Sequence, residues 1–176
     1  MKNLFAALCL ALPALVVQAQ GVALAESRIE FTSRQMGVPV QGRFARFTAD
    51  VTFDTAKPEA SRARLDVDMA SATMGVADID AELRKPEWFD SARHPRATFM
   101  ASRISGSGGA LRAEGTLTIK GVARPVTVPV TVKDGVASGQ FAIPRLAYKI
   151  GGGDWGDTSV VADEVQVRFT LKLTPR

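Results

Sequence analysis

Cysteine and histidine are nearly absent from this chain. Its 176 residues include one cysteine, Cys9, and one histidine, His94. A single thiol forms no internal disulfide, and structural zinc sites are built mainly from cysteine and histidine, so neither device stabilises the fold. The sequence also lacks the G-x-S-x-G motif that presents a serine nucleophile. Burial alone should therefore stabilise the fold, without a disulfide or a cysteine-based metal site. We predict no catalytic residue, no metal site and no cofactor.

A concentrated basic charge is also missing. The chain has 22 Lys and Arg against 18 Asp and Glu, a net charge of +4, and its arginines are spread along the sequence. Binding to nucleic acid requires a focused basic patch, so we exclude nucleic acid as a partner. A weak attraction to an anionic membrane surface stays open.

Two short motifs suggest ion or phosphate binding but lack the rest of the pattern. Asp66 and Asp68 alternate as calcium ligands can, but the glycine and the bidentate glutamate of a calcium loop do not follow. The glycines at 151–153 are followed by Asp154 and Trp155 instead of the lysine and helix of a phosphate loop. We interpret the first motif as the wet face of a strand and the second as a loop.

The N-terminus has the pattern of a secretory signal peptide. Lys2 precedes an apolar run over 4–17, and small residues follow at the spacing that signal peptidase requires. The run is shorter than the ~20 residues of a transmembrane helix. We predict that residues 1–25 are a signal, with cleavage after Ala19 or Ala25 and the second position favoured. The lone cysteine leaves with it, and 26–176 form one exported domain.

Alternation of apolar and polar residues dominates the rest of the chain. Over 165–173 the alternation is strict, which is typical of a half-buried strand. Similar patterns recur at 45–53, 63–70 and 115–132. Glycine-rich turn segments separate the strands, at 104–110, 133–135 and 151–157. Pro129 lies within a strand pattern, where proline indicates a bulge or an edge.

One segment, 78–90, departs from this alternation. Asp78 and Asp80 precede good helix formers, and Pro86 ends the run, so one short helix is predicted. Several strands extend to about ten residues, roughly 30 Å, which favours a barrel over a sandwich of short strands. We therefore predict an all-β fold, an antiparallel β-barrel of about eight strands with one short helical insertion.

Five segments follow one another in a recognisable order. They are SRIEFTSRQMGVPVQGRF at 27–44, FD at 53–54, LRKPEWFDSARHPRATF at 83–99, GTLTIKGVARPV at 115–126 and RLAYKIGGGDWGDTSVVADEVQVRF at 145–169. In this order, and nearly at this spacing, they resemble the YceI-like family of bacterial polyisoprenoid-binding proteins. The resemblance covers essentially the whole chain after the signal, from about Ser27 to Leu173.

The resemblance implies a lipocalin-like barrel in the periplasm that holds a long isoprenoid chain, such as a polyprenyl or quinone tail. It implies no enzymatic activity and no required metal, and a transient contact with the membrane or with a membrane cytochrome of the b type. Many members carry a His-Ser pair and a second histidine in the first two strands, where this chain has Arg28, Arg34 and Gln35. We therefore expect the ligand head group to differ here.

Inward faces rich in valine need not fill a barrel, so we predict an apolar cavity. The predicted ligand-binding residues are Phe47, Phe53, Phe99, Leu117, Ile119, Phe141, Tyr148 and Phe169, with Trp88 or Trp155 near a mouth. Trp155 is interpreted as a plug in preference to a lid.

Two other functions remain open from the sequence. One is an interaction module with a filled core. The other is an exported hydrolase that uses His94 with nearby carboxylates. The sequence also leaves open whether two chains pair as a homodimer.

Overall fold

A computed structural model describes residues 20–53 and 57–175. The predicted signal falls mostly outside these residues, including Ala19. The strands are β1 (Gln20–Val22), β2 (Arg28–Gln35), β3 (Val38–Phe44), β4 (Phe47–Thr52), β5 (Arg62–Asp68), β6 (Ala72–Thr73), β7 (Arg96–Ser107), β8 (Ala110–Ile119), β9 (Val122–Lys133), β10 (Val136–Pro144) and β11 (Glu164–Pro175). The helix is α1 (Ala77–Leu83), and the 3₁₀ turns are η1 (Leu24–Glu26), η2 (Pro58–Ala60), η3 (Met69–Ser71), η4 (Arg145–Tyr148) and η5 (Gly153–Trp155).

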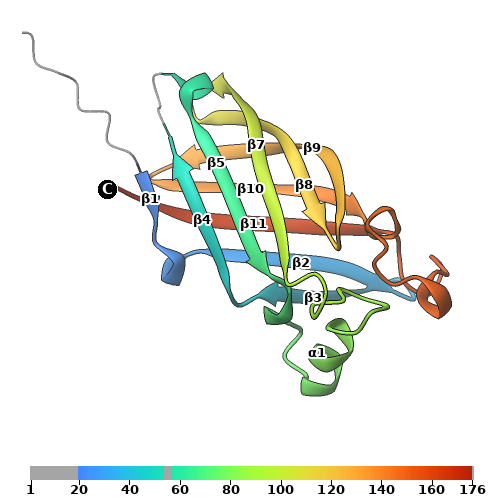
Figure 1. Cartoon of the computed structure of the whole chain (residues 1–176). Helices are drawn as coiled ribbons and strands as arrows, with labels where there is room; N and C mark the ends of the chain where they lie inside the picture. The colour runs from blue at the N-terminus through green and yellow to red at the C-terminus, as the bar shows by residue number, and fades with distance from the viewer. Residues whose placement is uncertain (1–19, 54–56, 176) are drawn as a thin grey trace, which may run out of the picture.

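The strands form one antiparallel sheet that curls around an interior (Figure 1). Its order is β4-β5-β7-β8-β9-β10-β11-β2-β3-β6, and β1 pairs with the far end of β11. Within the described residues the terminal strands β4 and β6 do not pair with each other, so the sheet is a curled half-barrel. The predicted antiparallel, lipocalin-like class is confirmed. The sheet has eleven strands, against the predicted number of about eight, and nine remain when the short β1 and β6 are left out.

β9 is the strand that holds Pro129. It pairs with β8 along that strand's whole length, but with β10 only at Thr131, Val132 and Lys133. Pro129 therefore lies where β9 has one partner, so its missing N–H interrupts no second ladder. Pro129 pairs with Arg112 without a bulge, and β9 is not an edge strand, because it lies between β8 and β10 in the sheet. The expected bulge or edge is therefore met only in that Pro129 has no ladder partner on the β10 side.

The predicted short helix is confirmed as α1, which ends three residues before Pro86. The Asp80 carboxylate fixes the start of the helix to β6, because it accepts hydrogen bonds from the Thr73 hydroxyl at 2.6 Å and the Met74 N–H at 2.7 Å. These bonds, that of Thr73 first, lower the pKa of Asp80. Leu83 is buried, and α1 lies across one end of the barrel, opposite β1 (Figure 1).

Two apolar clusters divide the interior along the strands. The first lies at the α1 end and includes Leu83, Trp88 and Ile150, while the second lies at the β1 end and includes Phe53 and Leu173. Phe99, Val126 and Phe141 pack against both clusters. The interior is thus one continuous apolar space with two ends.

Candidate functional site

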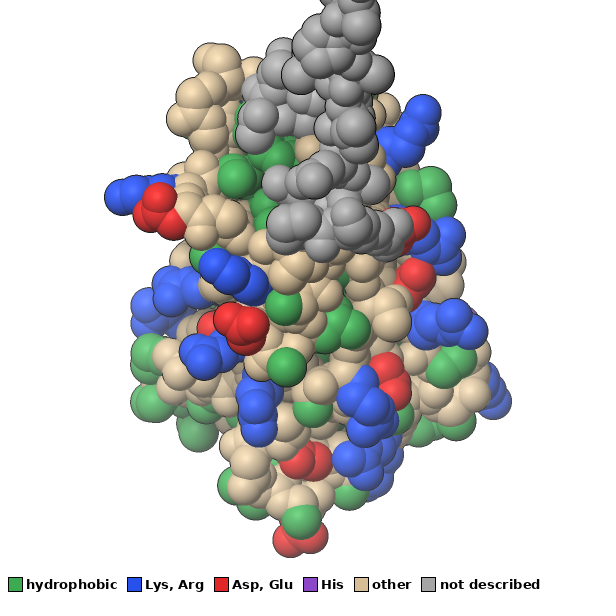
Figure 2. Space-filling view, turned by 90° about the vertical axis from the view of Figure 1, so that its left-hand side faces the viewer, with side chains coloured by type: hydrophobic (Ala, Val, Ile, Leu, Met, Phe, Trp, Pro, Cys, Tyr) green, Lys and Arg blue, Asp and Glu red, His purple; other side chains and the backbone are tan. Residues whose placement is uncertain are grey.

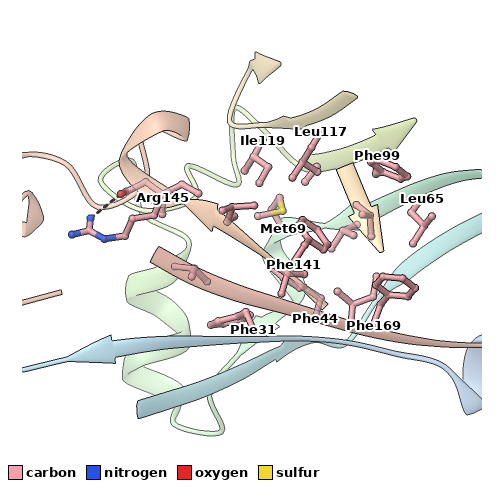
Figure 3. A pocket seen from close by; sticks show the side chains of 18 of the residues that line it. Phe31, Phe44, Leu65, Met69, Phe99, Leu117, Ile119, Phe141, Arg145 and Phe169 are labelled. Carbon is pink, nitrogen blue, oxygen red and sulfur yellow. Dashed lines mark hydrogen bonds between the residues drawn. The ribbon is translucent and has the colours of Figure 1, made fainter. Parts of the chain in front are cut away.

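A cavity of about 520 Å³ lies inside the curled sheet. Cavities that take small ligands measure about 300–1,000 Å³ and are lined mainly by apolar side chains. The lining here draws on both clusters, from Trp88 and Leu83 at the α1 end to Leu171 and Leu173 at the β1 end. Figure 3 shows side chains from several strands converging on this space. The predicted cavity is therefore present, and the core is not solid.

Most of the predicted site residues line this cavity. They are Phe53, Trp88, Phe99, Leu117, Ile119, Phe141, Trp155 and Phe169. Phe99 on β7, Leu117 and Ile119 on β8, Phe141 on β10 and Phe169 on β11 face inward because side chains alternate along each strand. Phe53, Trp88 and Trp155 lie outside these strands.

The prediction that Phe47 and Tyr148 line the cavity is wrong. Phe47 is the first residue of β4, at the end of the ladder, where it is half-buried and packs against the second cluster. Tyr148 is 1% exposed and lies in η4, after β10 has ended, so strand alternation does not direct its ring inward. The Arg124 guanidinium lies 6.0 Å from the centre of that ring. Burial raises the pKa of Tyr148, and Arg124 opposes the shift.

A group of aromatic side chains at the α1 end was missed. Phe31 and Phe44 lie 5.3 Å apart between ring centres, and Phe44 lies 5.9 Å from Phe89. The ring of Phe31 lies over Gly42, where a Cβ would come within 2.2 Å of it. The alternation of Ile29, Phe31 and Ser33 along β2 was the available signal, since all of these residues line the cavity.

Polar lining residues occur only at the α1 end. Those among the described residues are Ser33, Gln35, Asp78, Glu82 and Arg145. Asp78 and Glu82 belong to α1, and Gln35 forms a bridge with Val161 of the first cluster. The lining contributed by the second cluster is apolar throughout. The cavity therefore has one end that suits a polar group and one that suits hydrocarbon.

Arg145 is a buried cation, 1% exposed, beside the polar end. Each of its five N–H groups is used by a backbone carbonyl oxygen. Nε donates to Ala162 (3.0 Å), Nη1 to Ile150 (3.0 Å) and Gly151 (2.5 Å), and Nη2 to Trp155 and Val161 (both 2.7 Å). Its guanidinium points away from the apolar side chains (Figure 3). Burial lowers its pKa, and Asp163 opposes the shift. Arg145 therefore holds the segment 150–162 in place and has no N–H left for a ligand.

The two tryptophans lie at the same end. Their ring centres are 5.4 Å apart and the planes are tilted by 50°. Trp88 is 9% exposed, whereas Trp155 is 37% exposed. In the described part of the chain, Trp88 Nε1 and Ser33 Oγ are the buried side-chain atoms without a hydrogen-bond partner. The pair therefore extends from the surface to the cavity wall, as expected of residues at a mouth.

His94 lies apart from this site. It is half-buried, its ring lies beside Gly121 in the turn between β8 and β9, and it is not among the lining residues. Its backbone N–H donates to Asp90 O at 2.8 Å. No group of three His, Cys, Asp or Glu residues able to hold a metal ion occurs within 20–53 and 57–175.

The outer surface carries mixed charge. On the face that bears β1, Lys and Arg side chains are interspersed with Asp and Glu (Figure 2). None of the helices in the described ranges combines the length and the apolar character needed to cross a membrane.

Together, the curled antiparallel sheet, the apolar interior and the aromatic mouth define a lipocalin-like barrel with an internal cavity. The YceI-like domain family matches residues 21–173, and the chain belongs to this family. A UPF0312 protein of Shewanella oneidensis is 30% identical over 174 residues, which cover 98% of this chain and 86% of the relative. A UPF0312 protein of Pseudomonas aeruginosa is 31% identical over 101 residues, covering 57% of this chain and 53% of that relative, so the match spans about half its length.

Solved structures share the fold. The crystal structure of Burkholderia cenocepacia BcnA is 41% identical, with a TM-score of 0.81, and the match covers 85% of this chain and 98% of that one. A polyisoprenoid-binding domain from Saccharophagus degradans is 19% identical with a TM-score of 0.67, and the match covers 90% of this chain and 99% of that one. At that identity the second likeness concerns the fold alone.

Proposed function

We propose that this protein is a non-enzymatic carrier that binds a long-chain apolar ligand, of the polyisoprenoid or isoprenoid-quinone type, inside the barrel. The observation that carries the proposal is the continuous apolar cavity, which reaches from α1 to the β1 end. Burial of a hydrocarbon tail contributes about 25 cal/mol for each Å² removed from water, so affinity should rise with tail length. Membership of the YceI-like family supports the same function.

The proposed setting is the periplasm, reached through a cleaved signal peptide. We propose that the ligand is exchanged during transient contact with the membrane or with a membrane cytochrome. Exposed apolar side chains beside the mouth support this route. Met36 and Val160 are 78% and 40% exposed and are joined by a backbone hydrogen bond of 2.8 Å, and Ile79 on the lining is 42% exposed.

The other two functions are less well supported. A filled-core module is at odds with an interior that holds a cavity, and a hydrolase that uses His94 is at odds with the position of that residue outside the cavity.

Two measurements test the proposal. Mass spectrometry of an organic extract of protein purified without detergent should find a long-chain isoprenoid at stoichiometric amounts. An apolar fluorescent probe should bind the emptied protein and be displaced by long-chain isoprenoids. Ala113→Phe, which fills the β1 end, should favour shorter chains, while Met100→Phe at a half-exposed outer position should not. The carrier function would be refuted if folded protein yielded an extract without isoprenoid and also failed to bind the probe.

A further inference from the structure

The polar end of the cavity carries negative charge. Asp78 and Glu82 are the carboxylates of the lining, and they come from one face of α1. Glu82 forms an ion pair with Lys85 at 2.5 Å, whereas Asp78 forms none within the described residues. Each additional negative charge brought to this end therefore meets like charge, which disfavours binding.

The one cation of the lining does not compensate for these carboxylates. All five N–H groups of Arg145 are taken by backbone carbonyls, and the guanidinium points away from the cavity. A phosphate at this end would lose hydration without gaining a free cationic donor, and moving a charge out of water without hydrogen bonds is strongly unfavourable. Arg34, on the neighbouring hairpin, is exposed and donates to Gly37 O at 3.2 Å.

Uncharged donors, in contrast, are present at the same end. Trp88 Nε1 and Ser33 Oγ are buried without partners, and both residues line the cavity. A buried donor without a partner is unfavourable, so a ligand oxygen that accepted a hydrogen bond from either atom would make binding more favourable. A carbonyl, hydroxyl or ether oxygen meets this requirement without adding charge.

We propose that the site selects lipids by head group: an isoprenoid lies with its tail toward the β1 end and an uncharged, oxygen-bearing head at the α1 end, and Asp78 and Glu82 reject its phosphorylated counterpart. The proposal rests on the carrier function and adds the chemical class of ligand. It also gives α1, the one helix described, a role in specificity.

The test compares a polyprenol with the polyprenyl monophosphate of the same chain length, each displacing an apolar fluorescent probe from the emptied protein. We expect the alcohol to bind at least about tenfold more tightly, which corresponds to about 1.4 kcal/mol. The double variant Asp78→Asn/Glu82→Gln should reduce the ratio of alcohol affinity to phosphate affinity severalfold, mainly because the phosphate binds more tightly. Glu30→Gln/Glu59→Gln removes two exposed carboxylates that do not line the cavity and should leave the ratio unchanged.

A second comparison isolates the donor. Trp88→Phe keeps an aromatic ring but removes the N–H. It should therefore weaken the binding of a polyprenol more than the binding of squalene, a hydrocarbon with the same number of isoprene units as the alcohol chosen. Equal weakening of both ligands would assign Trp88 to packing and overturn its part of the proposal.

The outcomes separate the two proposals. Head-group selection is wrong if the phosphate binds as tightly as the alcohol, or if the ratio of the two affinities is the same in the Asp78→Asn/Glu82→Gln variant as in the wild type. The carrier function stands in both cases. If no alcohol, phosphate or hydrocarbon displaces the probe, both proposals fail.

Discussion

Replacing Arg145 by methionine removes five hydrogen bonds from the segment 150–162. Each bond joins the buried guanidinium to a backbone carbonyl, so the change affects the position of this segment and of Trp155 at the mouth. Methionine fills similar space but donates nothing. The variant therefore tests whether one side chain organises this end of the barrel.

The expected loss of stability can be worked from these contacts. A net value of about 1 kcal/mol for each hydrogen bond gives a loss of about 5 kcal/mol. The variant no longer buries a charge, which offsets part of this, and we expect a net loss of about 3 kcal/mol. Arg145→Lys should be no better than methionine, because it keeps the buried charge and offers at most three donors.

Urea unfolding followed by tryptophan fluorescence measures the effect, and dissociation of a bound apolar probe should become faster in the same variant. Arg124→Met is the control, since Arg124 donates one side-chain bond, to Ala147 O at 3.0 Å, and should lose less than about 1 kcal/mol. An Arg145→Met protein within about 0.5 kcal/mol of the wild type would refute the reasoning, as would full rescue by lysine.

Three further predictions concern other parts of the chain. Gly42→Ala should lower the free energy of unfolding by about 2 kcal/mol, because its Cβ overlaps the Phe31 ring; unchanged stability in urea would contradict that packing. Asp80 has a lowered pKa in the folded state, so its contribution to stability is present above the ordinary value of about 3.9 and is lost as the pH falls through the folded value. The difference in stability between wild type and Asp80→Asn should thus be larger at pH 7 than at pH 3, and a difference independent of pH would count against it. Cleavage after Ala25, the position favoured from the sequence, would remove β1, which pairs with β11, so the structure favours cleavage after Ala19 instead. N-terminal sequencing of exported protein should therefore find Gln20, and a chain that begins at Glu26 would contradict this prediction.

Alternation along the chain predicted the strands because it depends on local sequence alone. It also predicted which side chains of β8 and β11 face inward. It could not tell a filled interior from a hollow one, because that depends on how far the sheet curls and on the summed volume of residues from every strand. Tyr148 was misplaced for a related reason, since the chain leaves the strand pattern at η4 just before that residue.

The polar end of the cavity illustrates what local patterns miss. Ser33 lies on β2 and Glu82 on α1, and only the folded chain brings them to one end. In the sequence, Asp78 is explained by the preference for acidic residues at a helix start, and Arg145 is one arginine among many. Their roles depend on partners from distant segments: the carbonyls that saturate Arg145 belong to residues 150–162.

The short pairing between β9 and β10 has a mechanical consequence. The β9–β10 ladder divides the sheet into two halves, β4-β5-β7-β8-β9 and β10-β11-β2-β3-β6, and only three residue pairs join them. Small rotations of one half against the other leave the long ladders within each half intact, so the barrel is most flexible along the contact between β9 and β10. A barrel that opens and closes along this line can change its width to fit ligands of different size. Among the interior strands, amide hydrogen exchange should be fastest along β9 between residues 122 and 130.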